Sequence, residues 1–126
     1  MATILIVEDD PDALSILETF LGSRGHETHG AANGNEGLER LDEVRPDLVI
    51  LDVMMPGLDG WEVARRIRRR PDHADIGIVM LSARDGDAAR REGTDAGADV
   101  YLVKPVGLEE LEARIDSLLA DGDAYA

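Results

Sequence analysis

Four short, continuously apolar runs restrict the fold of this chain more than any other feature. They occupy residues 4–7, 48–51, 78–81 and 100–103, and segments long enough to form helices separate them. A strand that is apolar at every position, and not only at every second one, is typical of a parallel sheet covered by helices on both faces. The sequence therefore predicts an α/β fold with a buried parallel sheet.

Each apolar run ends on residues that can take part in phosphoryl chemistry. The first run leads into Glu8 and Asp9, the second into Asp52, the third into Ser82 and the last into Lys104. Because ligands of parallel sheets bind beyond the carboxyl ends of the strands, we expect these five side chains to meet at one edge. Lys104 is the only lysine, so a compact, flexible positive charge stands there in a chain that otherwise uses arginine.

Length and composition limit the class of protein. A chain of 126 residues suits one domain, which we place at residues 1–120 with a disordered tail at 121–126, and leaves too little room for an effector domain. The formal net charge of −14 disfavours direct binding to nucleic acid or to an anionic membrane. Cysteine is absent, and neither a signal peptide nor a membrane-spanning run is recognisable. We expect a soluble, cytoplasmic protein that binds other proteins.

Capping residues and helix breakers mark five helices between the strands. The helices are expected to begin after Asp10, Asn33, Asp59, the segment 85–87 and Gly107. The fourth of these has few large apolar residues, so it should be the least tightly packed.

A short edge strand is expected within residues 27–32, which brings the number of strands to five. Right-handed crossovers wind five strands and five helices into a (βα)5 three-layer sandwich, a flavodoxin-like fold with strand order 2-1-3-4-5. In that order the first and third strands are neighbours, and the chain winds in opposite directions on either side of them. Glu8, Asp9 and Asp52 therefore lie where the winding reverses.

Several other side chains receive structural interpretations. The arginines within residues 65–70 suit the solvated end of a helix. His26 and His29 lie on the weak strand without a third ligand, so no metal site is expected there. His73 is interpreted as a loop residue, and Trp61 is expected to cover part of its own helix.

The acidic residues at the predicted sheet edge favour a divalent cation. Glu8, Asp9 and Asp52 carry a charge of −3, which Lys104 reduces to −2, and one divalent cation would neutralise the remainder. Ligands that are few and all oxygen favour Mg²⁺ over Ca²⁺ or Zn²⁺. One carboxylate could then attack an activated phosphoryl group and form an acyl phosphate, with the metal, Ser82 and Lys104 each holding one oxygen.

An acyl phosphate carries more negative charge than the carboxylate it replaces. It should therefore pull Ser82 and Lys104 toward itself. Tyr101, three residues before Lys104 on the last strand, could swing inward into space left by a moving Ser82. Such a two-position element is what a switch requires.

The motifs that contain these residues resemble the response regulator receiver domains of two-component signalling, the CheY-like domains. In chain order the motifs are residues 7–9, residues 51–57 with Gly60, residues 81–83, residues 97–99 and residues 101–105. The resemblance covers residues 3–120. The strand order 2-1-3-4-5 is also the order known for this family, so that prediction rests partly on the resemblance.

The resemblance implies roles for the acidic residues. Asp52 would be the phosphoacceptor, Asp9 a direct Mg²⁺ ligand, and Glu8 a ligand acting mainly through a metal-bound water. Asp52 and the backbone carbonyl of Met54 would complete the protein's share of the metal site. The phosphoryl donor would be a phosphohistidine on a sensor histidine kinase or a phosphotransfer protein.

The resemblance also implies roles around the phosphoryl group. Ser82 and Lys104 would contact it, the Lys104–Pro105 peptide bond would be cis, and Tyr101 would be the aromatic switch. Receivers catalyse their own phosphorylation and dephosphorylation, so whether to count the protein as an enzyme stays open. By the same resemblance, the side chains of Met54 and Arg84 would occupy the positions that tune dephosphorylation. Val106 departs from the phenylalanine that is common after Lys-Pro.

Other functions and states of assembly remain to be weighed. A haloacid dehalogenase-type phosphatase needs a second acid where this chain has Met54, and a flavodoxin-like FMN carrier would be repelled by residues 8–10. A pseudo-receiver that binds proteins without being phosphorylated is the main alternative. The fourth helix, last strand and last helix would form the output face for an unknown protein, and the chain would be a monomer or a weak, phosphorylation-dependent dimer. A stand-alone regulator, a relay intermediate and an excised domain all fit the sequence.

Overall fold

A computed structural model describes residues 2–124, and the side chains of residues 2–120. Five strands alternate with five α-helices along the chain, with one short 3-10 helix, η1, before the fourth strand. The elements are β1 (Thr3–Val7), α1 (Pro11–Ser23), β2 (Glu27–Ala31), α2 (Gly34–Val44), β3 (Leu48–Asp52), α3 (Gly60–Arg69), η1 (Pro71–His73), β4 (Gly77–Ser82), α4 (Asp87–Ala96), β5 (Val100–Val103) and α5 (Leu108–Ala124).

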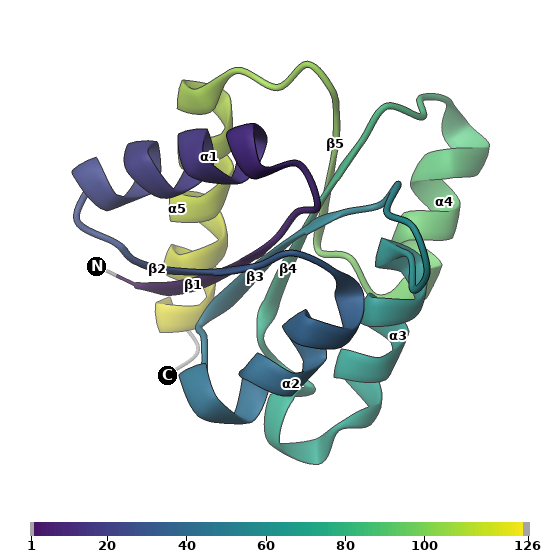
Figure 1. Cartoon of the computed structure of the whole chain (residues 1–126), viewed down its shortest axis with the longest axis horizontal. Helices are drawn as coiled ribbons and strands as arrows, with labels where there is room; N and C mark the ends of the chain where they lie inside the picture. Colours follow the sequence, from purple (N-terminus) through teal and green to yellow (C-terminus); the bar gives the residue numbers. More distant parts are fainter. Residues whose placement is uncertain (1, 125–126) are drawn as a thin grey trace.

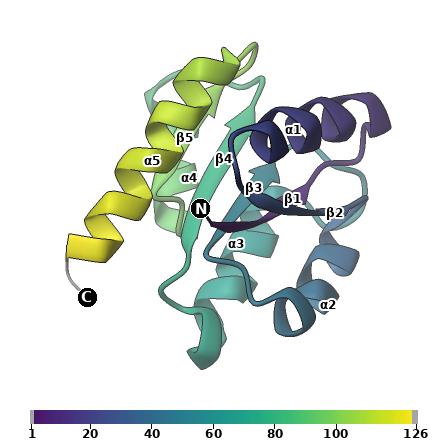
Figure 2. The ribbon, with the colours of Figure 1, turned by 90° about the vertical axis from the view of Figure 1, so that its left-hand side faces the viewer.

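The five strands form one parallel sheet in the order β2-β1-β3-β4-β5, which confirms the predicted fold. Helices α1 and α5 cover one face, and α2, α3 and α4 cover the other, as Figures 1 and 2 show. Among residues 2–124, none of the helices is both long and apolar enough to span a bilayer.

Side chains of the central strands alternate between two apolar cores. On β1, Ile4 and Ile6 join the core beneath α1 and α5, whereas Leu5 and Val7 join the core beneath α2, α3 and α4. Residues 48–52 of β3 are buried at every position. Burial on both faces explains why the strands are apolar throughout.

The predicted caps hold three helix starts in place. The side chains of Asp10, Asn33 and Asp59 accept hydrogen bonds from the backbone N–H groups of Asp12, Glu36 and Glu62. Helix α4 begins differently: Gly86 stands at its N-cap without a side-chain hydrogen bond, and its buried residues are all small. The amino end of α4 is therefore the least supported helix start of these four.

Two structural interpretations from the sequence are wrong. His73 is buried in η1, and its Nε2 lies 2.8 Å from Oδ1 of Asp42, a contact that lowers the pKa of Asp42. Arg68 does not belong to a solvated face, because its guanidinium bonds backbone carbonyls before β4 and at the end of α4. Asp42 and Gly97 lie about thirty residues from His73 and Arg68 in the sequence, so local pattern could not reveal these contacts.

The carboxyl end of the chain continues as helix beyond the predicted limit of the domain. Helix α5 extends to Ala124, into the segment 121–126 for which a tail was predicted. Residues 125 and 126 of that segment lie outside the described residues, and the domain boundary at residue 120 stays a prediction.

Candidate functional site

Three acidic side chains meet at the carboxyl edge of the sheet, where β1 and β3 lie side by side. Carboxylate oxygens of Glu8, Asp9 and Asp52 all lie within 4.8 Å of one another, the only such cluster of acidic, histidine or cysteine side chains among the described residues. Glu8 and Asp52 are buried, and Asp9 is exposed. The sheet order places them together, because β1 and β3 are paired in parallel and end at the same level.

Lys104 reaches the same cluster from the segment after β5. Its Nζ lies 3.2 Å from Oδ1 of Asp52 and 3.5 Å from Oε1 of Glu8. Although partial burial acts in the opposite sense, the charges of Asp52 and Glu8 raise the pKa of Lys104 above its usual value. The lysine thus stays protonated and faces two carboxylates at once.

The electrostatics of the cluster leave negative charge uncompensated. Burial first, and then a hydrogen bond and charge repulsion with Asp52, raise the pKa of Glu8 to about 7 from its ordinary value of 4.5. Burial disfavours the charged form of a carboxyl group, and the neighbouring charge of Asp52 acts in the same direction, whereas Lys104 opposes both. One lysine does not balance three carboxylates.

The residues present fit a small divalent cation. A cation with metal–oxygen distances of about 2.1 Å needs ligand oxygens about 3 to 4 Å apart, and the three carboxylates come close to that spacing. The donors are oxygens only, which suits Mg²⁺. Glu8, Asp9 and Asp52 are the side chains that would hold it. The remaining proposed ligand, the carbonyl of Met54, belongs to the loop after β3.

The loop after β3 is shaped around Asp52. The backbone N–H of Met54 donates to Oδ1 of Asp52 over 3.3 Å, and the side chain of Met54 is 59% exposed. Gly60 begins α3 against the same segment, where a Cβ atom would come within 2.7 Å of the Asp52 carbonyl oxygen. Glycine is therefore required for α3 to approach the phosphoacceptor candidate so closely.

Ser82 is the last residue of β4. Asp52, at the end of β3, pairs with Leu81, the residue before Ser82, so Ser82 and Asp52 lie on neighbouring strand ends. Ser82 is fully buried, and its Oγ accepts a hydrogen bond of 3.0 Å from the backbone N–H of Arg84. The Lys104–Pro105 peptide bond is cis. The structure thus brings Glu8, Asp9, Asp52 and Lys104 into one cluster, with Ser82 at its border.

Tyr101 lies on β5, and its side chain is in the interior of the protein. It is buried, and its hydroxyl donates to the carbonyl oxygen of Arg84 over 2.8 Å. Its ring stacks on Trp61, a contact that the sequence analysis missed. A glycine in the middle of α4, Gly93, was the available signal that a large side chain packs closely against that helix.

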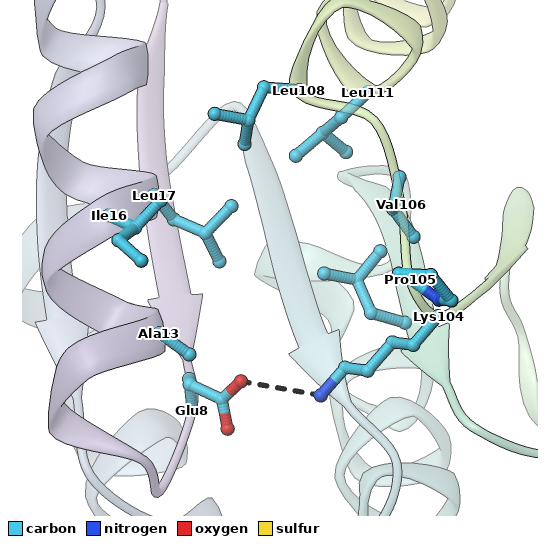
Figure 3. A pocket seen from close by; sticks show the side chains of 10 residues that line it. Glu8, Ala13, Ile16, Leu17, Lys104, Pro105, Val106, Leu108 and Leu111 are labelled. Carbon is cyan, nitrogen blue, oxygen red and sulfur yellow. Dashed lines mark hydrogen bonds and ion pairs between the residues drawn. The ribbon is translucent and has the colours of Figure 1, made fainter.

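An apolar groove of about 450 Å³ opens beside the site, between α1 and the segment that joins β5 to α5. Figure 3 shows the ion pair of Glu8 and Lys104 at one end and the apolar side chains of both segments around the rest. Val106, where phenylalanine is common in the family that the sequence resembles, lines this groove, and Ile16 on α1 is 57% exposed. An exposed apolar surface therefore lies next to the acidic cluster.

Comparison with known proteins gives one consistent answer. The family model described as the response regulator receiver domain matches residues 4–116. The transcriptional regulatory protein AfsQ1 of Streptomyces coelicolor is 46% identical over 123 residues, which are 98% of this chain and 53% of AfsQ1. The response regulator MprA of Mycolicibacterium vanbaalenii is 47% identical over 116 residues, 92% of this chain and 49% of MprA. The chain thus spans about half the length of these curated relatives.

Solved structures agree with the sequence relatives. A putative response regulator from Chloroflexus aurantiacus superposes with a TM-score of 0.89 at 39% identity, covering 94% of this chain and 98% of that one. The Vibrio cholerae chemotaxis protein CheY4 superposes with a TM-score of 0.89 at 30% identity, with the same coverage of both chains. The likeness therefore extends over nearly the whole of each of these structures.

Proposed function

Because this chain belongs to the response regulator receiver domain family of two-component systems, we propose that Asp52 accepts a phosphoryl group from a phosphohistidine in a Mg²⁺-dependent reaction. The observation that carries the proposal is the position of Asp52. It is buried at the carboxyl end of β3, 3.2 Å from the ammonium of Lys104 and within one carboxylate cluster with Glu8 and Asp9. The ammonium of Lys104 offers positive charge to the oxygens of a phosphoryl group, and the carboxylates of Glu8 and Asp9 would hold the cation that supplies the rest.

The proposed transfer is a displacement at phosphorus. A carboxylate oxygen of Asp52 forms the new O–P bond as the P–N bond of the phosphohistidine breaks, and the departing imidazole keeps the electron pair and takes up a proton. Lys104 and Ser82 contact oxygens of the phosphoryl group. Bound Mg²⁺, held by Glu8, Asp9, Asp52 and the Met54 carbonyl, would supply the positive charge that the protein lacks.

Two features of the site argue against a phosphatase acting on small substrates. The residue two positions after Asp52 is Met54, whose exposed side chain has no acid to protonate a leaving group. The groove beside Lys104 is open and apolar, which suits contact with a protein donor better than enclosure of a small phosphate ester. The donor in this proposal is a sensor histidine kinase or a phosphotransfer protein.

The output is proposed to be a protein contact on the face formed by α4, β5 and α5. Tyr101 lies beneath α4 on this face, and the small buried residues of α4 make it the easiest helix to shift. AfsQ1 is named a transcriptional regulatory protein, so control of transcription through a further domain is one possible output of the proposal. Association as a weak dimer after phosphorylation and a cytoplasmic location belong to the same proposal.

Intact-mass measurement after incubation with acetyl phosphate and Mg²⁺ tests the proposed chemistry. We expect a gain of one phosphoryl group that disappears on mild alkaline hydrolysis, as an acyl phosphate does. Asp52→Asn and removal of metal should each abolish the gain. Asp75→Asn, an exposed acid at the opposite edge of the sheet, should leave it unchanged.

A negative result would separate the alternatives. If the folded protein binds Mg²⁺ but takes no phosphoryl group from acetyl phosphate or from a histidine phosphotransfer protein, the pseudo-receiver explanation replaces this one. Steady turnover of p-nitrophenyl phosphate would instead favour a phosphatase.

A further inference from the structure

The ring of Tyr101 is enclosed by groups outside the acidic cluster. Trp61 stacks on it with ring centroids 6.0 Å apart and an angle of 7° between the ring planes. The guanidinium of Arg90 lies 5.8 Å from the ring centroid. With the hydroxyl donating to the Arg84 carbonyl, the side chain is satisfied at both its apolar and its polar end.

Gly93 provides the space in which this ring sits. A Cβ atom at Gly93 would lie 2.6 Å from Cδ2 of Tyr101 and 3.1 Å from Cζ3 of Trp61. Both atoms belong to buried, stacked rings that have little room to move. Glycine in a helix interior weakens the helix relative to alanine, and α4 is only ten residues long. The close approach of the two rings is a physical reason for glycine at this position.

Two hydrogen bonds connect this ring to the candidate site. The backbone N–H of Arg84 donates to Oγ of Ser82, and the backbone carbonyl of the same residue accepts from the Tyr101 hydroxyl. A displacement of Ser82 would therefore move the one peptide segment that also holds Tyr101. The guanidinium of Arg84 lies 5.9 Å from the Trp61 ring, so the segment contacts both aromatic residues.

We infer that Trp61 and Gly93 are positioning residues, which form a slot that fixes Tyr101 inward and ties its ring to α4. Trp61 on α3 is the fixed wall of the slot, and Gly93 on α4 is the moving wall. A displacement that begins at Ser82 would then reach α4 through the ring, and α4 could not tilt without moving it. The inference rests on the proposed phosphorylation of Asp52 for its trigger, but the slot itself does not depend on that reaction.

The slot can be tested first without any phosphoryl donor. Nitration of Tyr101 by tetranitromethane, followed by peptide mass spectrometry, should be strongly suppressed in the folded protein relative to the protein in urea. We expect Gly93→Ala and Trp61→Leu to increase the nitration rate at Tyr101 at least tenfold, because the ring is pushed out or loses its wall. Trp61→Phe, which keeps an aromatic wall, should restore most of the protection.

Gly22→Ala is the matched control for the glycine substitution. Gly22 also belongs to a helix, in the last turn of α1, and a Cβ atom there would meet nothing within 4 Å. It should leave the nitration rate unchanged. Circular dichroism of every variant establishes that it is folded. Equal protection of Tyr101 in the wild type, Gly93→Ala and Trp61→Leu would overturn the slot.

The coupling to α4 is tested in the phosphorylated protein. Amide chemical shifts of α4 are compared before and after treatment with acetyl phosphate and Mg²⁺, and the mass of the same sample reports how much Asp52 is modified. In Trp61→Leu we expect the shift changes in α4 to fall at least threefold at equal modification, while those beside Asp52 persist. Undiminished α4 changes at equal modification would overturn the coupling. Failure of the wild type to become modified would count against the proposed function alone, because the nitration result still decides the slot.

Discussion

At the carboxyl edge of the sheet, three carboxylates face a single lysine, whereas at the amino edge one arginine is surrounded by acceptors. The guanidinium of Arg68 donates to the carbonyl oxygens of Ala74, Ile76 and Gly97 and to the carboxylate of Asp99 over 2.6 to 3.0 Å. That carboxylate also accepts from the backbone N–H of Ile78. The guanidinium of Arg68 and the carboxylate of Asp99 are thus both satisfied by hydrogen bonds.

The contrast separates two uses of charge in one small domain. The amino edge joins α3, β4 and the end of α4 through satisfied hydrogen bonds, which contribute to stability. The carboxyl edge concentrates like charges in a buried place, which costs stability and is typical of functional sites. Changes at the first edge should therefore weaken the fold, and changes at the second should weaken activity while sparing or improving the fold.

Removal of Arg68 should have the largest effect on stability. Arg68→Met removes the guanidinium that donates to three backbone carbonyl groups and to the Asp99 carboxylate, so we expect a loss of about 3 kcal/mol in the free energy of unfolding. Urea denaturation followed by circular dichroism measures it. Arg69→Met, at a side chain that is 70% exposed, should change stability by less than about 0.5 kcal/mol. Similar effects of the two substitutions would remove the contrast on which this comparison rests.

Asp52→Asn should act in the opposite direction. In the absence of metal it removes one of two buried carboxylates that repel each other, so we expect the free energy of unfolding at pH 8 to rise by about 1 kcal/mol. The loss of the contact with Lys104 limits the gain, although Glu8 remains within 3.5 Å of the ammonium. Urea denaturation in EDTA gives the value. Destabilisation would indicate that Lys104 already neutralises the cluster.

A smaller effect is expected from pH, because the free energy of unfolding should depend on the ionisation of Glu8 at the carboxyl edge. With the pKa of Glu8 raised from 4.5 to about 7, the folded protein holds a proton that the unfolded chain releases between these values. The contribution of Glu8 to stability is complete below pH 4.5 and is lost as the pH rises through 7. We expect metal-free protein to lose stability across this window.

The Glu8 contribution is isolated by difference. Glu8→Gln removes the titration, so the gap in unfolding free energy between this variant and the wild type should widen from pH 5 to pH 8 in EDTA. Saturating Mg²⁺ should close much of the gap at pH 8, because the cation favours the ionised carboxylate. A gap that stays constant with pH would show that Glu8 has an ordinary pKa.

Much of the fold was predictable because its signals are local. Continuous apolar runs predict the buried strands. Asp10, Asn33 and Asp59 are recognised as helix caps from the residues just after them. The clustering of Glu8, Asp9 and Asp52 followed from the expected strand order, which itself rested partly on the family resemblance. The environment of Tyr101 could not be predicted in this way, because Trp61 and Gly93 contact it from two different helices. Distance in the sequence also hid the contact of His73 with Asp42 and that of Arg68 with Asp99, each of which joins residues 31 positions apart.

The position of Trp61 in the slot also gives the protein an intrinsic fluorescent probe. Trp61 is the only tryptophan in the chain, so all indole emission comes from one buried position against Tyr101 and beneath the Arg84 guanidinium. Emission wavelength and quenching of a single indole respond to the polarity and the neighbours within a few ångströms. The unlabelled protein should therefore report a movement of Tyr101 or of the Arg84 segment as a change in tryptophan fluorescence. Stopped-flow mixing with a phosphoryl donor would then measure the rate of the movement that we propose to pass from Asp52 to α4.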